Sequence, residues 1–180
     1  MLKKVVLALL WSIVCTTAHA SSTIIGTGTA DKPMRFYYNK ESIHCMALNI
    51  YFEARNDHTA GQAAVGDVVL NRVMHKDYPN SICAVIKQGP VSRWWKEKGK
   101  EVPLRDRCQF SWYCDGRSDE PRKGDSWQKA YDIALGLVVL NRYRGITEGA
   151  THYHATYVNP SWSKNLFLVG RIGEHIFYRK

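Results

Sequence analysis

The segment Ala47-Leu-Asn-Ile-Tyr-Phe-Glu-Ala-Arg55 places one carboxyl group on the apolar stripe of a predicted helix. Met46, Ile50 and Glu53 follow one another at spacings of four and three residues, so Glu53 is expected to point where the core residues point. Partial burial disfavours the charged form of a carboxyl group and raises its pKa, which makes a glutamic acid a proton donor near neutral pH. Two interpretations follow: a catalytic acid facing a cleft, or a structural carboxylate paired with Arg55 or another basic residue at the edge of the core.

Helical periodicity extends to both sides of this segment. A first helix is predicted from about Ser42 to Arg55, and a second begins at Thr59, where Thr59-Ala-Gly-Gln62 matches a capping box. Pro79 is expected to open a third, shorter helix that ends at Gly89. Another helix resumes near Ser126.

After Gly145 the residue pattern changes to one that is typical of strands. Ala150–Val158 and Phe167–Tyr178 alternate and are rich in Thr, Tyr, His, Ile and Phe, which predicts a small antiparallel sheet. Helices with a minor sheet toward the C-terminus make an α+β fold. We therefore expect one α+β domain over residues 41–180, preceded by a flexible lead-in over 21–40 that is rich in Ser, Thr and Gly.

Residues 1–20 have the features of a signal peptide. Lys3 and Lys4 form a basic start, Val5–Val14 is apolar, and Ala18-His19-Ala20 is a small-residue cleavage site. The apolar run is too short for a membrane-spanning helix, and no second run could anchor the mature chain. We expect an exported protein, periplasmic or secreted, without a stable membrane anchor and monomeric.

Four cysteines remain after removal of the signal peptide: Cys45, Cys83, Cys108 and Cys114. An even number in an oxidising compartment favours disulfides, and three pairings are possible. Cys108 and Cys114 flank a short aromatic segment and could close a small loop, which would leave Cys45 to join Cys83. A zinc site is less favoured because no pair has the close C-x-x-C spacing.

The charge of the chain narrows the class of partner. The chain carries +9, of which the signal peptide contributes two lysines, so the mature part carries +7. An exported basic protein is attracted to anionic polymers, such as cell-wall glycans with acidic peptides. No nucleic-acid-binding motif is present, so we expect no nucleic acid partner.

Several segments, taken together and in order, resemble those of the SleB-type cell-wall hydrolases, a family named after spore cortex-lytic enzymes. The matching segments span nearly all of residues 45–179: Ala47–Arg55, Gly61–Val65, Val68–Val73, Tyr78–Cys83, Cys108–Trp112, Gly149–His154, Val158–Trp162 and Ile172–Tyr178. The resemblance implies a lysozyme-like domain that acts on the glycan strands of peptidoglycan, with Glu53 as the catalytic residue. Residues 89–107 depart from it, because they form a longer and more basic segment than the family leads us to expect.

The resemblance further implies cleavage between N-acetylmuramic acid and N-acetylglucosamine. Glycosidases generally pair a carboxylic acid with a second carboxylate, whereas a lytic transglycosylase needs one, because the 6-hydroxyl of muramic acid attacks and forms a 1,6-anhydro ring. Asp57 is interpreted as an entry residue of the second helix, Asp67 as solvated, and Asp115 as a turn residue. We therefore favour a lytic transglycosylase over an N-acetylmuramidase that uses water.

Candidate substrate-binding residues come from two segments. Gln109, Ser111 and Trp112 belong to an aromatic loop that could line a sugar cleft, with Trp112, Tyr113 and Tyr153 as stacking surfaces for sugar rings. The resemblance places Thr151 and His152 on a strand that faces the cleft.

Two other function classes remain open. His152 and His154 lie on one face of a predicted strand and could begin a zinc site with His44, His58 or His175, as in an amidase or peptidase. No H-E-x-x-H helix is present, so we expect no metal and no cofactor. A wall-binding module without catalysis is the remaining alternative.

Overall fold

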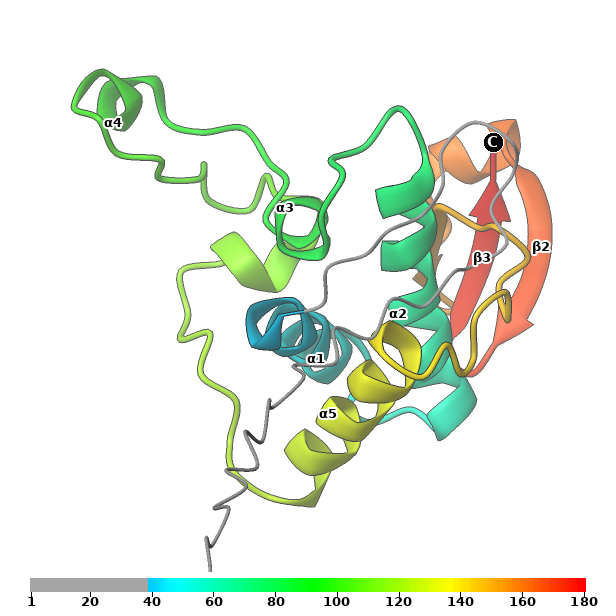
Figure 1. Cartoon of the computed structure of the whole chain (residues 1–180). Coiled ribbons are helices and arrows are strands. Elements are labelled where there is room, and N and C mark those ends of the chain that lie inside the picture. Colours follow the sequence, from blue (N-terminus) through cyan, green and yellow to red (C-terminus); the bar gives the residue numbers. More distant parts are fainter. Residues whose placement is uncertain (1–38) are drawn as a thin grey trace, which may run out of the picture.

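The computed structural model describes residues 39–180 (Figure 1). The predicted signal peptide and nearly all of the predicted lead-in lie outside these described residues. Among residues 39–180, no helix is both long enough and apolar enough to cross a membrane.

The first helix, α1 (Lys40–Ala54), is the central element of the helical layer. It begins two residues before the predicted start, because the side chain of Asn39 accepts a hydrogen bond of 2.8 Å from the backbone N–H of Ser42. Met46, Ala47 and Ile50 are fully buried. Helix α1 packs against α5 (Asp125–Val138), α2 (Thr59–Met74) and α3 (Ile82–Ile86) (Figure 1).

Helix α2 begins at Thr59 as predicted, but the predicted capping box is wrong. The N-cap is His58, whose Nδ1 accepts from the N–H of Gly61 at 3.2 Å. Gln62 instead donates from Nε2 to the carbonyl of Asp57 at 2.9 Å, because the link between α1 and α2 is short and passes directly beneath this side chain. Gln62 therefore fixes the link and not the first turn of α2.

The middle of the chain contains short helices. Helix α3 covers a smaller range than the predicted Pro79–Gly89, because the side chain of Ser81 accepts from the N–H of Ala84 and starts the helix there. Helix α4 (Arg93–Glu97) and the 3-10 helix η1 (Ser111–Cys114) follow before α5, which begins at Asp125, next to the predicted Ser126.

Three antiparallel strands form the sheet near the C-terminus, in the order β1-β3-β2. They are β1 (His152–Ala155), β2 (Phe167–Ile172) and β3 (His175–Arg179), and the 3-10 helix η2 (Ser161–Asn165) precedes β2. The alternating segment Phe167–Tyr178 is thus a hairpin of two strands, because Gly173 turns the chain at a φ of 60°. The predicted α+β fold, mainly helical with a small C-terminal sheet, is confirmed.

The sheet rests on α2 through a small apolar cluster. Ala64 and Val68 of α2 contact Ala150 and Phe177, and all four side chains are fully buried. Burial of this area fixes the sheet against the helical layer. One face of α2 therefore contacts the helices and another contacts the sheet.

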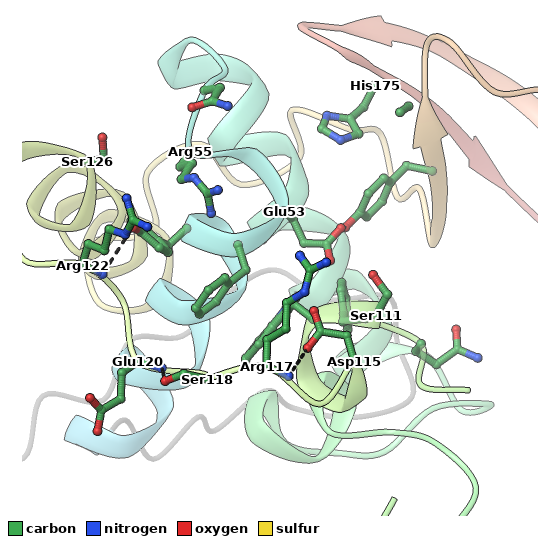
Figure 2. A pocket seen from close by; sticks show the side chains of 18 of the residues that line it. Glu53, Arg55, Ser111, Asp115, Arg117, Ser118, Glu120, Arg122, Ser126 and His175 are labelled. Carbon is green, nitrogen blue, oxygen red and sulfur yellow. Dashed lines mark hydrogen bonds between the residues drawn. The ribbon is translucent and has the colours of Figure 1, made fainter. Parts of the chain in front are cut away.

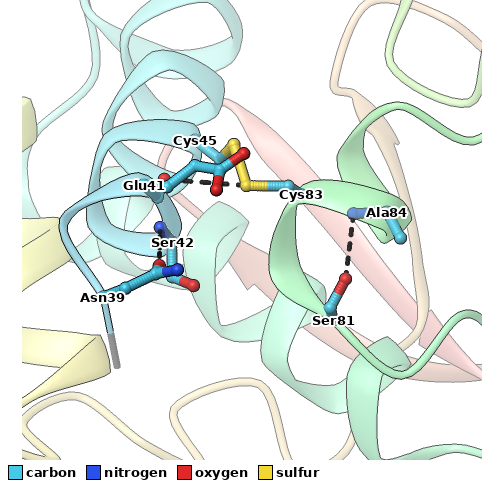
Figure 3. The surroundings of a disulfide bond; sticks show 7 residues. All are labelled: Asn39, Glu41, Ser42, Cys45, Ser81, Cys83 and Ala84. Atoms are coloured by element: carbon cyan, nitrogen blue, oxygen red, sulfur yellow. Dashed lines mark hydrogen bonds between the residues drawn. A yellow bond between two sulfur atoms is a disulfide. The ribbon is translucent and has the colours of Figure 1, made fainter. Parts of the chain in front are cut away.

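Two disulfides join the cysteines in the predicted pairing. Cys45 of α1 is bonded to Cys83 of α3, which closes a loop with a sequence separation of 38 residues (Figure 3). Cys108 is bonded to Cys114 and closes the short loop that contains η1. Such crosslinks restrict the unfolded chain and hold α3 and η1 in place.

The prediction that Asp67 is solvated is wrong. Its side chain is fully buried, because the loop after α5 folds over this face of α2 and surrounds the carboxylate with donors. Thr147 donates from its N–H at 3.1 Å and from Oγ1 at 2.6 Å, Gly145 donates from its N–H at 3.1 Å, and the guanidinium of Arg144 forms an ion pair. Asp67 is therefore a structural carboxylate that fixes the loop leading to the sheet.

We predict that Asp67→Asn lowers the free energy of unfolding by about 3 kcal/mol, because it leaves a partly buried guanidinium without its counter-ion. Urea denaturation of both proteins measures this loss. Asp132→Asn is the matched control, since its carboxylate is exposed and accepts only from Gln128. An equal effect of the two substitutions would contradict the structural role of Asp67.

Candidate active site

A cleft of about 1080 Å³ lies at the C-terminal end of α1 (Figure 2). Its walls come from the last turn of α1 with the residues that follow it, Arg72 of α2, the segment 109–126, residues 153–158 and His175 of β3. Elements far apart in the sequence thus converge on one hollow, and Glu53 lies within it.

Glu53 occupies the last turn of α1 and faces the cleft, as its position on the apolar stripe predicts. The phenol of Tyr153 on β1 donates a hydrogen bond of 3.0 Å to Oε2 of Glu53. Arg55 does not form the ion pair of the alternative interpretation, since its guanidinium lies over the ring of Tyr51, 5.3 Å from the ring centroid. Within the described residues, the hydrogen-bonding partner of Glu53 is therefore a neutral phenol.

Opposing influences set the protonation of Glu53. Burial is the largest and raises the pKa of Glu53, while the hydrogen bond from Tyr153 and the positive charge of Arg72 lower it in part. Burial and the nearby Glu53 charge also raise the pKa of Tyr153 well above 10, so the phenol stays protonated and remains a donor. The net effect raises the pKa of Glu53, and the two partners can still stabilise the carboxylate once the proton has left.

Arg72 of α2 is a buried cation in the same cleft that the sequence pattern did not reveal. Its Nε donates to the carbonyl of Thr151 at 2.8 Å, and its guanidinium lies over the rings of Phe110 and Tyr78 at 5.2 and 5.3 Å. Its Nη1 is buried and has no hydrogen-bonding partner among the described residues. An Asn-Arg pair in the last turns of a helix is commonly solvent-exposed, so only the tertiary contacts identify Arg72 as buried.

The neighbouring Asn71 makes a parallel connection to the sheet. Its Nδ2 donates to the carbonyl of Ala150 at 2.9 Å and to Oγ1 of Thr147 at 3.0 Å. Together with Arg72, Asn71 ties the end of α2 to the residues that lead into β1. This connection determines where Tyr153 meets Glu53.

The aromatic wall of the cleft is rigid. The indole of Trp112 donates from Nε1 to Oδ1 of Asn49 at 3.0 Å, and its ring stacks on Phe52 with centroids 4.9 Å apart. Trp112 is only 8% exposed. Trp112 thus lines the cleft in an orientation that Asn49 and Phe52 fix.

Asp57 and Asp115, the other two candidates for a second carboxylate, accept hydrogen bonds from backbone N–H groups of the fold. Asp57 is buried and accepts hydrogen bonds from the backbone N–H groups of His58 and Glu174, so it joins the α1–α2 link to the turn before β3. Asp115 lines the cleft, but its Oδ1 accepts from the N–H of Arg117 at 2.8 Å as in a turn (Figure 2). Glu53 is thus the carboxyl group in the cleft whose pKa burial raises.

The structure brings together four of the seven predicted substrate-binding residues. Gln109, Ser111, Trp112 and Tyr153 line the cleft.

The other three do not line the cleft. Tyr113 packs against the core, and Thr151 is buried with its carbonyl bound to Arg72. Nδ1 of His152 forms a hydrogen bond of 2.9 Å with Oγ1 of Thr151, and the ring of His152 lies beside Trp162.

Several basic side chains on the cleft rim were not predicted. They are Arg55, Arg117, Arg122 and Lys123, and none of them has an ion-pair partner within residues 39–180. Figure 2 shows Arg55 directly after α1, and Arg117 beside Asp115 and Arg122 near Ser126 on the segment that follows η1. Unpaired cations around a cleft attract an anionic ligand.

The histidines that could begin a zinc site have other partners. His154 makes contacts of 3.0 Å from Nε2 to the phenol of Tyr178 and 2.9 Å from Nδ1 to the carbonyl of Ala155. His175 lies with Nδ1 3.6 Å from Asp57. Over the part of the chain that the structure describes, no three His, Cys, Asp or Glu side chains are arranged to hold a metal ion.

The family model described as Cell Wall Hydrolase matches residues 56–178. This range begins three residues after Glu53, so the role of Glu53 is argued from the cleft itself. A spore cortex-lytic enzyme of Bacillus cereus is 41% identical over 49 residues, which cover 27% of this chain and 19% of that enzyme. The match to the family confirms the resemblance that the sequence segments indicate.

Two solved structures have the same fold. The catalytic domain of the germination-specific lytic transglycosylase SleB from Bacillus anthracis matches with a TM-score of 0.52 and 24% identity, covering 81% of this chain and 100% of that domain. The catalytic domain of the Bacillus cereus SleB protein matches with a TM-score of 0.52 and 22% identity, covering 84% of this chain and 100% of that domain.

We predict that Glu53→Gln stabilises the protein at high pH and much less at low pH. The pKa of Glu53 is raised in the folded state. At low pH the wild-type side chain is neutral in both the folded and the unfolded protein, as Gln is. As the pH rises, ionisation of Glu53 is less favourable in the folded than in the unfolded protein and so destabilises the wild type, whereas Gln stays neutral. The increase in Tm relative to wild type should be larger at about pH 8 than at about pH 4. Glu148→Gln, at an exposed position, is the control. A Tm difference that is independent of pH would contradict a raised pKa.

Proposed function

This chain belongs to the cell wall hydrolase family, and we propose that it cleaves the glycan strands of peptidoglycan as a lytic transglycosylase. The bond broken joins N-acetylmuramic acid to N-acetylglucosamine, and the product carries a 1,6-anhydro end. The observation that carries the proposal is one carboxyl group, Glu53, whose pKa burial raises and which lies in a large cleft with a tyrosine donor beside it.

Glu53 acts twice in the proposed reaction. Its proton passes to the glycosidic oxygen as the bond to the anomeric carbon of muramic acid breaks, and N-acetylglucosamine leaves as the free alcohol. The 6-hydroxyl of the same muramic acid then attacks that carbon, and its proton returns to the Glu53 carboxylate. Between the two steps the hydrogen bond from Tyr153 and the charge of Arg72 stabilise the carboxylate.

The surroundings of the other acidic residues support this mechanism over the alternative in which water attacks. The carboxylate of Asp57 is bound to backbone N–H groups, and that of Asp67 is enclosed by its own donors. Asp115 closes a turn. Asp115, on the loop that lines the cleft, has Oδ1 held by the N–H of Arg117, whereas the proposed reaction needs Glu53 alone.

The lining of the cleft suits a polymer that is both sugar-rich and anionic. Trp112 and Tyr153 offer aromatic surface to sugar rings, and Gln109 and Ser111 offer an amide and a hydroxyl to acetamido groups and ring hydroxyls. The unpaired cations on the rim suit the carboxylates of the stem peptides. We place the enzyme in the cell-wall compartment, where this polymer is found.

We predict that the purified protein releases soluble muropeptides from peptidoglycan that are one water lighter than reducing disaccharide-peptides and that resist borohydride. Mass spectrometry of the products measures both properties. Glu53→Gln should lower the rate at least about 100-fold, because the variant has no proton to donate.

Reducible products would make the enzyme a muramidase with a water nucleophile and would retain Glu53 as the acid. Equal release by wild type and Glu53→Gln would contradict the role of Glu53. Glu148→Gln is the matched control and should keep full activity, since this exposed residue is remote from the cleft lining.

We predict that Tyr153→Phe moves the basic limb of the pH profile of kcat/KM to higher pH. The lost hydrogen bond favours the ionised form of Glu53, so its loss raises the pKa of Glu53 further, and the acid survives to higher pH. Below that limb the rate should fall about tenfold, because the forming carboxylate loses a charge-assisted hydrogen bond. Tyr143→Phe, at an exposed phenol, should change neither quantity. A limb at unchanged pH would contradict the coupling of Tyr153 to Glu53.

A further inference from the structure

Residues 90–107 form a projecting arm, here called the Trp arm, that no step of the proposed reaction uses (Figure 1). Its two sides are joined by backbone hydrogen bonds of 2.8 Å, from the N–H of Ser92 to the carbonyl of Val102 and from the N–H of Leu104 to the carbonyl of Pro90. Helix α4 lies at its tip, away from the helices and the sheet (Figure 1). The arm is therefore an ordered hairpin and not a loop draped over the core.

The Trp arm adds nothing to the hydrophobic core. None of the residues of α4 is buried, and Trp94 is 54% exposed. Val102 and Leu104 on the same arm are also exposed. Exposed apolar side chains that gather on a projecting element are typical of an interaction site.

The arm is also basic, and its cations lie on its aromatic rings. Six lysines and arginines stand against three acidic residues over 90–107. Nζ of Lys98 is 3.5 Å from the ring centroid of Trp94, and Nζ of Lys100 is 5.2 Å from that of Trp95. The two indoles are themselves packed edge to face at 4.4 Å. The arm thus presents aromatic surface and positive charge together.

The base of the arm adjoins the wall of the cleft. The N–H of Gln109 donates to the carbonyl of Gln88 at 2.9 Å, and a Cβ on Gly89 would meet Cα of Cys108 at 3.0 Å. Cys108 is bonded to Cys114, and the loop between them carries the cleft residues Ser111 and Trp112. The residues of the arm itself do not line the cleft.

We propose that the Trp arm is a second binding site, which holds a peptide-bearing glycan strand of the polymer that the cleft cleaves. This inference rests on the proposed function. The indoles pack on the C–H faces of sugar rings, and the lysines pair with the carboxylates of the acidic stem peptides. While the Trp arm is bound to the insoluble polymer, the cleft meets further glycan at high effective concentration. The enzyme therefore stays on its repetitive substrate between cleavages. An anionic membrane would also suit tryptophan and lysine, but the junction with the cleft wall favours the polymer.

The test is co-sedimentation with purified, insoluble peptidoglycan. All proteins carry Glu53→Gln, so the polymer stays intact during the measurement. The Trp94→Ala/Trp95→Ala and Lys98→Gln/Lys100→Gln variants should each raise the apparent Kd at least about tenfold. Lys76→Gln/Lys164→Gln is the control with the same loss of charge at exposed positions outside the arm and the cleft, and it should leave the Kd close to that of Glu53→Gln alone.

A second measurement separates this inference from the proposed function. With Glu53 intact, the arm variants should digest short soluble glycan oligomers at the wild-type rate and insoluble peptidoglycan more slowly. Absence of digestion of both substrates by the wild type would overturn the proposed function, and the sedimentation result would still report on the arm. Unchanged sedimentation of both arm variants would overturn the inference. The inference would also be overturned if the arm variants lost binding to phosphatidylglycerol vesicles but not to peptidoglycan, because that result would assign the arm to a membrane.

Discussion

The arrangement of the site depends on the bonds between the end of α2 and the residues that lead into β1. Arg72 and Asn71 donate to consecutive carbonyls, those of Thr151 and Ala150, and so fix the distance between helix and strand. Two residues further along the chain, the phenol of Tyr153 reaches Glu53. The apolar contacts of Ala64 and Val68 with Phe177 also hold the sheet on α2, but such contacts are not directional. The polar bonds supply the register that places a donor next to the carboxyl group.

The same contacts account for the electrostatic behaviour of the cleft. Burial raises the pKa of Glu53, and a buried arginine and a phenol lower it in part. A residue that only lost its hydration would hold its proton tightly and release it with difficulty, whereas one paired tightly with a cation would be ionised at rest. Glu53 lies between these limits. A reaction in which one carboxyl group first gives and then takes a proton requires such a balance.

The main helices, the small sheet and the disulfide pairing were predictable from the sequence, and the polar contacts between distant elements were not. The spacing of Met46, Ile50 and Glu53 reports the face of a helix, so the orientation of Glu53 follows from periodicity. Asp67 and Arg72 lie on a helix with the same kind of pattern, but their partners are about eighty residues away, and no local rule brings them together. Polar residues whose burial is compensated by distant groups therefore escaped prediction.

The central claim is that the folded protein holds Glu53 as a protonated acid. It is tested most directly by titrating the side-chain carboxyl carbon of Glu53 by ¹³C NMR, with the resonance assigned by its absence from the spectrum of Glu53→Gln. The account predicts a pKa above that of an ordinary glutamate, because burial is the largest influence on this group. A pKa at or below the ordinary value would show that the carboxylate is ionised at rest, and it would contradict the assignment of Glu53 as the proton donor.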